Sequence, residues 1–211
     1  MQKTRIGIYG GTFGPVHLGH MHAAMQFLSC CALNRLYIIP TAIPPHKERS
    51  TNDTPIQRLD MLRLAFSAEG FSDDRICISD YEQQRGGKSY TIHTLQHFQG
   101  DNVQLYLLCG TDMFLTLEDW YRGDEILSST NICCLMREDD PSKCAQVMQM
   151  AEHYQGTYQT EVIIPKHTPY PVSSTEVRRR IAQNQSTDGL LHPTVRDYID
   201  CHRLYKNTMT E

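Results

Sequence analysis

The chain has 211 residues, a length that accommodates one full-sized domain with at most a small appendage. Its hydrophobic share of 40% and charged share of 21% exclude a disordered chain and a repetitive fibre. The formal net charge of −4 argues against a protein that coats DNA or RNA, because such proteins carry a basic excess.

The cysteines indicate a reducing environment rather than a metal or redox motif. Eight are present, and no two of them have the C-x-x-C spacing of zinc ribbons and thioredoxin-like proteins. Most lie in apolar runs, where Cys behaves as a small hydrophobic residue. No secretory signal precedes the first strand-like run, so we expect reduced cysteines in a cytoplasmic protein.

One stretch is long enough to cross a bilayer: residues 6–34 contain no Asp, Glu, Lys or Arg. Glycines, a proline, three histidines, Gln26 and Asn34 interrupt it, and so many polar groups are costly in lipid. We therefore expect no membrane span. The missing carboxylates instead make this stretch suitable for binding an anion.

Short apolar runs alternate along the chain with segments in which apolar residues recur at helical spacing. The runs predict strands and the periodic segments predict helices; Gly10 and Gly11 are expected to end the first strand. We expect strands at residues 5–9, 36–39, 75–79, 103–109, 131–136 and 161–164, and helices at 20–33, from 55, at 90–98, 141–154, 175–183 and 194–202.

The second predicted helix has a well-marked beginning. Asp53 or Thr54 is expected to cap it, and Pro55 suits its first position because that residue needs no N–H partner. Its buried face is expected to comprise Ile56, Leu59, Leu62 and Phe66.

Strands that alternate with helices predict a Rossmann-like, doubly wound and mainly parallel sheet with helices on both faces. We expect a single domain over residues 1–211. Ligands of such sheets bind beyond the carboxyl ends of the strands, where the strand order reverses. The loops at residues 10–20 and 110–112, after the first and fourth strands, are therefore the candidate sites.

The first of these loops carries the strongest chemical signal. Glycines after a strand let the backbone approach a ligand, and a helix that begins near Gly19 directs its free N–H groups toward the same space. His17 and His20 are three residues apart and can lie side by side. The loop is neither a dinucleotide fingerprint nor a Walker A loop, and no Glu separates the histidines as in a zinc motif. A glycine-rich turn with two incidental histidines is the alternative.

Two segments resemble the signatures of the HxGH nucleotidyltransferases. Residues 10–20, GGTFGPVHLGH, resemble the first signature, and residues 173–178, SSTEVR, resemble the second. The chain between them is similar to the bacterial nicotinate mononucleotide adenylyltransferases. The matching pieces are residues 39–40, 44–47, 58–62, 89–91, 94–95 and 110–112, Trp120, and positions within 195–205.

The resemblance implies adenylyl transfer from ATP to nicotinate mononucleotide, which yields nicotinate adenine dinucleotide and pyrophosphate. The amide mononucleotide and phosphopantetheine are alternative acceptors. The family usually carries Asp where this chain has Gly14, which leaves open how the loop geometry or the contacts of metal-bound water are maintained. A nucleotide-binding sensor without catalysis is therefore a further alternative.

The resemblance also implies an ATP site. His17 and His20 would contact the phosphates and stabilise the charge that develops on them, although either ring could simply brace the loop. Arg178 would pair with the departing pyrophosphate, and the helical part at about residues 173–205 would complete the site. Residues 173–176 also have the form of a helix capping box. The other ATP-binding residues implied are Gly10, Gly11, Thr12, Phe13, Gly19, His46, Lys47, Ser174 and Thr175.

A mononucleotide site is implied as well. Trp120 would stack on the pyridine ring, with a core indole as the alternative. The backbone N–H groups of Tyr90 and Thr91 would hold the nicotinate carboxylate, and Asp112 would bind a ribose hydroxyl. Ser89 and Gly110 are the other mononucleotide-binding residues implied.

The expected partners follow from this reaction. They are ATP and nicotinate mononucleotide, without nucleic acid or membrane, and the oligomeric state stays open, a homo-oligomer included. Mg²⁺ is expected as cofactor, held mainly by the ATP phosphates and water, because it gives up its water reluctantly. We expect no protein metal ligands and no zinc.

Overall fold

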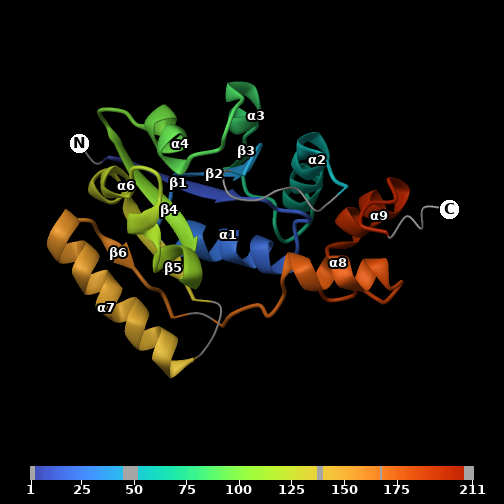
Figure 1. Ribbon diagram of the computed structural model, residues 1–211. Coiled ribbons are helices and arrows are strands. Elements are labelled where there is room, and N and C mark those ends of the chain that lie inside the picture. Colours follow the sequence, from blue (N-terminus) through green and yellow to red (C-terminus); the bar gives the residue numbers. More distant parts are fainter. Residues whose placement is uncertain (1–2, 45–51, 137–139, 167, 207–211) are drawn as a thin grey trace.

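A six-stranded parallel sheet forms the centre of the computed structural model (Figure 1). The structure describes residues 3–44, 52–136, 140–166 and 168–206. The strand order β3-β2-β1-β4-β5-β6 reverses between β1 and β4, so the predicted doubly wound parallel sheet is confirmed. The strands are β1 (Thr4–Gly11), β2 (Arg35–Pro40), β3 (Ile76–Ile78), β4 (Val103–Gly110), β5 (Asn131–Leu135) and β6 (Val162–Ile163).

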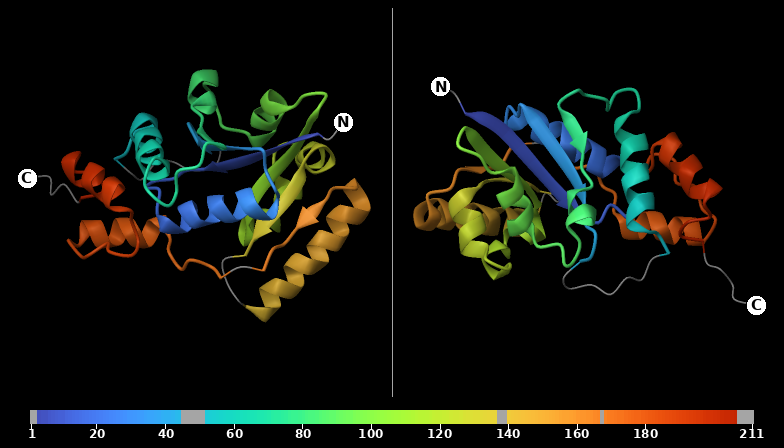
Figure 2. Two further views of the ribbon diagram at one scale, coloured as in Figure 1. Left: turned by 180° about the vertical axis from the view of Figure 1, so that it is seen from behind. Right: turned by 90° about the horizontal axis from the view of Figure 1, so that it is seen from above.

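Helices cover both faces of the sheet (Figure 2). The longer ones that were predicted are present, and most of their ends differ from the predicted ones by two residues or fewer. The exceptions are α1, which ends three residues earlier, and α7, which runs four residues further. The helices are α1 (Leu18–Cys30), α2 (Pro55–Phe66), α3 (Tyr81–Arg85), α4 (Thr91–Phe98), α5 (Thr111–Phe114), α6 (Gly123–Ser129), α7 (Pro141–Tyr158), α8 (Ser174–Ala182) and α9 (Pro193–Cys201), with a 3₁₀ turn η1 (Leu117–Asp119).

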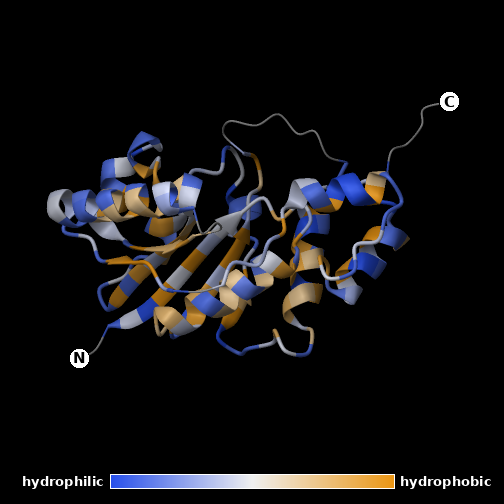
Figure 3. Ribbon diagram, turned by 90° about the horizontal axis from the view of Figure 1, so that it is seen from below, coloured by the Kyte–Doolittle hydropathy of each residue, from blue (hydrophilic) through white to orange (hydrophobic). Residues whose placement is uncertain are grey.

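The strands separate two hydrophobic cores because their side chains alternate between the faces. Tyr106 and Leu108 belong to the core that packs under α1, α2, α8 and α9, whereas Leu105 and Leu107 belong to the core under α4, α6 and α7. Apolar residues accordingly concentrate on the strands and on the inward sides of the helices (Figure 3).

Two local predictions were wrong. Gly10 and Gly11 do not end β1; they pair with Ile39 and Pro40 of β2, which carries the strand two residues further. Ile56 is 65% exposed rather than buried, because the inner stripe of α2 takes in Arg58 and Met61 instead.

The beginning of α2 follows the sequence signal. Thr54 is the N-cap: its side chain accepts the N–H of Gln57, and the Gln57 side chain accepts the N–H of Thr54. Asp53, the other candidate cap, is buried instead.

The uncharged stretch at residues 6–34 is divided between β1, a loop and α1. No helix among the residues described is both long and apolar enough to cross a membrane.

Candidate active site

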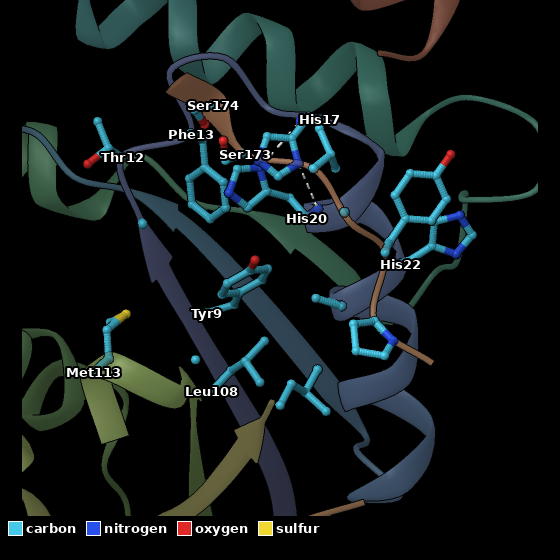
Figure 4. Close-up of a pocket in the computed structure, with 18 of the residues that line it drawn as sticks. Tyr9, Thr12, Phe13, His17, His20, His22, Leu108, Met113, Ser173 and Ser174 are labelled. Carbon is cyan, nitrogen blue, oxygen red and sulfur yellow. Dashed lines mark hydrogen bonds between the residues drawn. The ribbon is translucent and has the colours of Figure 1, made fainter. Parts of the chain in front are cut away.

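A cavity of about 790 Å³ lies at the carboxyl ends of β1 and β4, where the strand order reverses (Figure 4). The start of α1 forms one wall, and the segment that leads into α8 forms another. The predicted site residues that line the cavity are Gly10, Gly11, Thr12, Phe13, His17, Gly19, His20, Gly110, Ser174, Thr175 and Arg178.

His17 and His20 form a reciprocal cap at the beginning of α1. His17 Nδ1 accepts the backbone N–H of His20 at 3.3 Å, and His20 Nδ1 accepts the backbone N–H of His17 at 3.3 Å. The two rings stack with centroids 3.6 Å apart and planes 20° from parallel. Two histidines three residues apart thus reproduce the capping box usually made by Ser or Thr with Glu.

This cap fixes the tautomer of both rings. A nitrogen that accepts a hydrogen bond cannot carry the proton, so the proton of each neutral imidazole lies on Nε2. Both rings line the cavity, and each therefore has an N–H donor on the nitrogen that the cap does not use. Bracing the loop and contacting a ligand are compatible roles for the same side chain.

The backbone of α1 contributes less than the sequence suggested. We expected free N–H groups at its N-terminus, but Leu18 donates to the carbonyl of Leu190 and His20 donates to His17. That expectation was wrong for these two groups, because the C-terminal segment and the reciprocal cap satisfy them. The imidazoles are therefore the main donors from this element.

Gly19 is required by the space around it. A Cβ there would lie 2.8 Å from Val172 Cγ1 and 3.2 Å from the ring of His17. The glycine thus allows the C-terminal segment and the His17 ring to approach α1 from both sides.

The two signature segments meet at this cavity. Arg178 donates from Nη1 to the carbonyl of Gly14 at 2.7 Å, and Ser174 Oγ donates to the carbonyl of Pro15 at 3.2 Å. Arg178 also donates from Nη2 to Thr175 Oγ1 at 3.2 Å, which orients its guanidinium across the start of α8. Segments about 160 residues apart therefore share one site.

The predicted capping box at Ser173 is only half formed. Ser173 Oγ accepts the N–H of Glu176, but the Glu176 carboxylate turns to Arg179 and Arg180. These arginines, Arg179 first, lower the pKa of Glu176 to about 2. The two arginines are thereby held outside the cavity, whereas Arg178 lines it.

The described lining is suited to anions. It contains the Arg178 guanidinium and three imidazoles, from His17, His20 and His22, and no carboxylate among the residues described. Phosphates at this place would meet donors and a positive charge without a repelling acid.

Five of the predicted mononucleotide residues lie outside this lining. Ser89 is buried, and its Oγ accepts the N–H groups of Ala42 and Ile43, so it ties that segment to α4. Asp112 is 84% exposed at its side chain and lies 3.7 Å from Lys143 Nζ. Tyr90 is the N-cap of α4 and Thr91 its first residue, while Trp120 is partly buried against the second core.

Two predicted ATP-binding residues, His46 and Lys47, lie outside the residues that the structure describes. Conversely, the structure adds two aromatic residues that the sequence did not single out. His22 and Tyr170 line the cavity with their rings stacked at 4.8 Å and 12°. The signal was weak: His22 follows His20 by two residues, and Tyr170 precedes the SSTEVR segment by three.

The described residues contain one group of side chains close enough to share a metal ion, and it is not at the cavity. The thiols of Cys30, Cys31 and Cys133 lie within 4.8 Å of one another. Cys30 ends α1, and the rise of the helix places it roughly 15–20 Å from the histidines at the other end.

Comparison with known families defines the class of this fold and site. Residues 8–180 match the cytidylyltransferase-like family, a class of nucleotidyltransferases. Curated relatives are 32% identical in Clostridium botulinum (strain Eklund 17B / Type B), over 96% of this chain and 98% of theirs, and 32% identical in Pseudomonas aeruginosa (strain UCBPP-PA14), over 96% and 97%. Both are named probable nicotinate-nucleotide adenylyltransferase. The chain belongs to the nicotinate-nucleotide adenylyltransferase family, and it is an enzyme of NAD biosynthesis.

Solved structures agree on the fold. Nicotinic acid mononucleotide adenylyltransferase of Plasmodium falciparum, complexed with NaAD, superimposes with a TM-score of 0.75 at 17% identity, over 96% of this chain and 97% of that one. A putative nicotinate-nucleotide adenylyltransferase of Vibrio parahaemolyticus gives a TM-score of 0.64 at 19% identity, over 99% and 98%.

Proposed function

We propose that the cavity binds ATP so that the 5′-phosphate of nicotinate mononucleotide attacks the α-phosphorus. A bond forms between that phosphate oxygen and the α-phosphorus, the α–β bridging bond breaks, and pyrophosphate leaves with the electron pair. The products are nicotinate adenine dinucleotide and pyrophosphate. The observation that carries the proposal is the convergence of the histidine pair and Arg178 on one cavity at the point where the strand order reverses.

The histidine pair acts as a fixed pair of donors. The reciprocal cap uses Nδ1 of each ring, so Nε2–H is the donor toward the phosphates, and the stacked rings cannot turn independently. Donors held in place before the reaction stabilise negative charge without reorganising, which is the main source of catalysis where no covalent intermediate forms. His17 and His20 are therefore the catalytic residues.

Arg178 serves the leaving group. Its bonds to Gly14 O and Thr175 Oγ1 place the guanidinium beside the loop that follows β1. A guanidinium can pair with two phosphate oxygens at once, and it stays charged at every physiological pH. Pyrophosphate would thus depart toward a permanent cation.

The start of α4 is the proposed carboxylate site of the acceptor. Tyr90, its N-cap, makes no side-chain capping bond, and the first turn of this eight-residue helix has no acidic residue. A helix N-terminus of this kind favours an anion, which selects the acid over the amide. Tyr90 packs against Tyr121 at 4.5 Å, next to Trp120, so an aromatic surface for the pyridine ring adjoins it.

Mg²⁺ is the proposed cofactor. The described lining offers no carboxylate to hold it, so ATP phosphates and water would be its ligands. When bound, the ion neutralises charge on the triphosphate; the protein side chains position that complex.

The eight cysteines support a reducing compartment, and we propose the cytoplasm. All eight are free thiols, including the vicinal pairs at 30–31 and 133–134.

Pyrophosphate release with ATP and each acceptor tests the proposal. We expect turnover with nicotinate mononucleotide to exceed turnover with the amide at equal concentration, and none with phosphopantetheine. A preference for the amide would assign a different acceptor. ATP binding without pyrophosphate release would instead identify a sensor.

A further inference from the structure

A buried ionic cluster lies beneath the loop that follows β1, outside the cavity lining. The side chains of Asp53 and Arg58 are each 2% exposed, with Arg58 Nε 3.9 Å from Asp53 Oδ2. The hydroxyl of Tyr205 donates to the same Asp53 oxygen at 2.7 Å. Burying a charge pair this deeply costs desolvation free energy unless further hydrogen bonds offset it. The other hydrogen bonds of Arg58 show which parts of the chain the pair connects.

Arg58 fastens two loops of the sheet edge. Its Nη1 donates to the carbonyl of Thr12 at 2.8 Å and to the carbonyl of Thr41 at 2.7 Å. Thr12 follows β1 and Thr41 follows β2, so one guanidinium joins the backbones that leave two adjacent strands. Thr12 itself lines the cavity.

Gly14 is the point at which this cluster touches the same loop. A Cβ on Gly14 would lie 2.8 Å from Asp53 Oδ2 and 3.6 Å from Arg58 Cδ. The glycine is needed for space, because a side chain there would displace the Asp53 carboxylate. On the cavity side, the carbonyl of Gly14 accepts the bond from Arg178. The loop is thus held from one side by Arg178 and from the other by Asp53 and Arg58.

Tyr205 connects the end of the described chain to this arrangement. Its backbone N–H donates to Asn52 Oδ1 at 3.0 Å, and its φ of 60° is unusual for a residue with a side chain. Burial and the adjacent Asp53 carboxylate raise the pKa of Tyr205, so its hydroxyl remains a donor at all working pH values.

We propose that Asp53 is a positioning residue of the ATP site. Its carboxylate orients Arg58, which sets the backbone from Thr12 to Gly14 against Arg178. Asp53 and the glycine at position 14 form a matched pair, in which the carboxylate occupies the space that a side chain at 14 would need. This proposal rests on the proposed function: its kinetic part needs the adenylyl transfer, whereas its binding part needs only that the cavity binds ATP.

The pair predicts a specific non-additivity. Asp53→Ala leaves Arg58 unoriented, and we expect kcat to fall by about 10²-fold, as for small misplacements of catalytic groups. Gly14→Asp places two carboxylates in one space and is expected to fall by a similar factor. In Gly14→Asp/Asp53→Ala the new carboxylate can reach Arg58, since its Cβ would lie 3.6 Å from Arg58 Cδ. The double variant should recover at least about tenfold over Asp53→Ala.

Asp60→Asn is the matched control. Asp60 lies on α2, which Asp53 precedes, and like Asp53 it accepts a tyrosine hydroxyl from the C-terminal part, that of Tyr198, at 3.3 Å. Its hydrogen bond with Tyr198 and its ion pair with Arg63 involve no residue of the loop after β1. We expect Asp60→Asn to change kcat by less than about twofold, since surface changes of this kind have small effects. A loss in kcat equal to that of Asp53→Ala would overturn the proposal, because breaking a contact away from the loop would then have the same effect.

The decisive readouts are kcat, KM and the ATP dissociation constant. Urea unfolding measures the folded fraction of each variant, and kcat is calculated per folded protein. Additive losses in kcat and in ATP affinity overturn the proposal, as does an Asp53→Ala variant that is merely less stable. If the wild type binds ATP but releases no pyrophosphate, the proposed function fails. The ATP affinities of Asp53→Ala, Gly14→Asp and the double variant still test the role of Asp53.

A second cycle covers the case in which Asp53→Ala does not fold. It combines Asp53→Asn with Gly14→Ala. The added methyl group should cost less ATP affinity in the Asp53→Asn background than in the wild-type background, where it meets the carboxylate. An equal loss of ATP affinity in the two backgrounds would refute the coupling between Asp53 and Gly14.

Discussion

At the scale of single residues, His17 and His20 serve folding and chemistry with different atoms of the same ring. Nδ1 caps α1, and Nε2–H is the proposed donor to the phosphates. The spacing of three residues places each ring over the other's backbone N–H. A side chain at either position therefore needs an acceptor for the cap and a donor for the ligand on the same ring.

His20→Ala separates the two contributions. We expect turnover to fall by about 10²-fold or more, the scale for losing a donor to a transition state. The loss of one cap should lower the free energy of unfolding by only about 1 kcal/mol. Steady-state kinetics and urea unfolding measure the two effects.

His97→Ala is the control for that substitution. His97 is exposed and stacks on Tyr81 at 3.9 Å, and it does not line the cavity. Its turnover should match the wild type. A His20→Ala variant with nearly normal turnover would leave His20 with the role of a cap alone.

At the scale of elements, the sequence predicted what depends on local signals. Helical periodicity located α1 and α7, short apolar runs located the strands, and Thr54 with Pro55 marked the start of α2. The four- and five-residue helices α5 and α3 escaped prediction because they are too short to show a period. The Ile56 prediction failed because Arg58, a charged residue, takes an inner position that no hydrophobic pattern reveals.

The start of α8 makes a prediction about pH. The arginine partners hold the pKa of Glu176 at about 2, below its ordinary value of 4.5. Because the folded-state pKa is the lower one, the ion pairs stabilise the fold above pH 4.5, and that contribution is lost as the pH falls toward 2. Urea unfolding of the wild type should therefore show a midpoint that declines across this window.

Glu176→Gln tests the assignment. Its midpoint should decline less steeply between about pH 5 and pH 3 than that of the wild type. The difference should shrink in high salt, because the carboxylate is partly exposed and salt screens its ion pairs. Parallel declines would show that Glu176 has no share in the pH dependence.

At the scale of the whole molecule, the cavity depends on contacts that no local pattern encodes. The two signature motifs predicted which segments form the walls of the cavity. Hydrogen bonds from Arg178 to Gly14 and from Ser174 to Pro15 show that these segments meet. The bond from Tyr205 to Asp53 spans 152 positions. Arg58 and Tyr205 lie in segments that resemble the family, but nothing in the sequence connects them with Asp53 or Gly14. The contacts beneath the loop therefore could not be predicted and are identified by burial and distance.

Because the two ends of the chain build the cavity together, ATP should stabilise the entire fold. At a ligand concentration of about 100 times its dissociation constant, a site that exists only in the folded state adds about 2.7 kcal/mol. For a chain of this size that corresponds to a rise in Tm of roughly 5–10 °C. Thermal unfolding with and without ATP measures this rise in Tm.

Arg178→Ala should show a much smaller rise at the same ATP concentration. Arg179→Ala, which changes the same helix outside the cavity, should keep the full rise. Equal shifts in all three proteins would mean that ATP binds without the C-terminal wall, and the shared site would then be refuted.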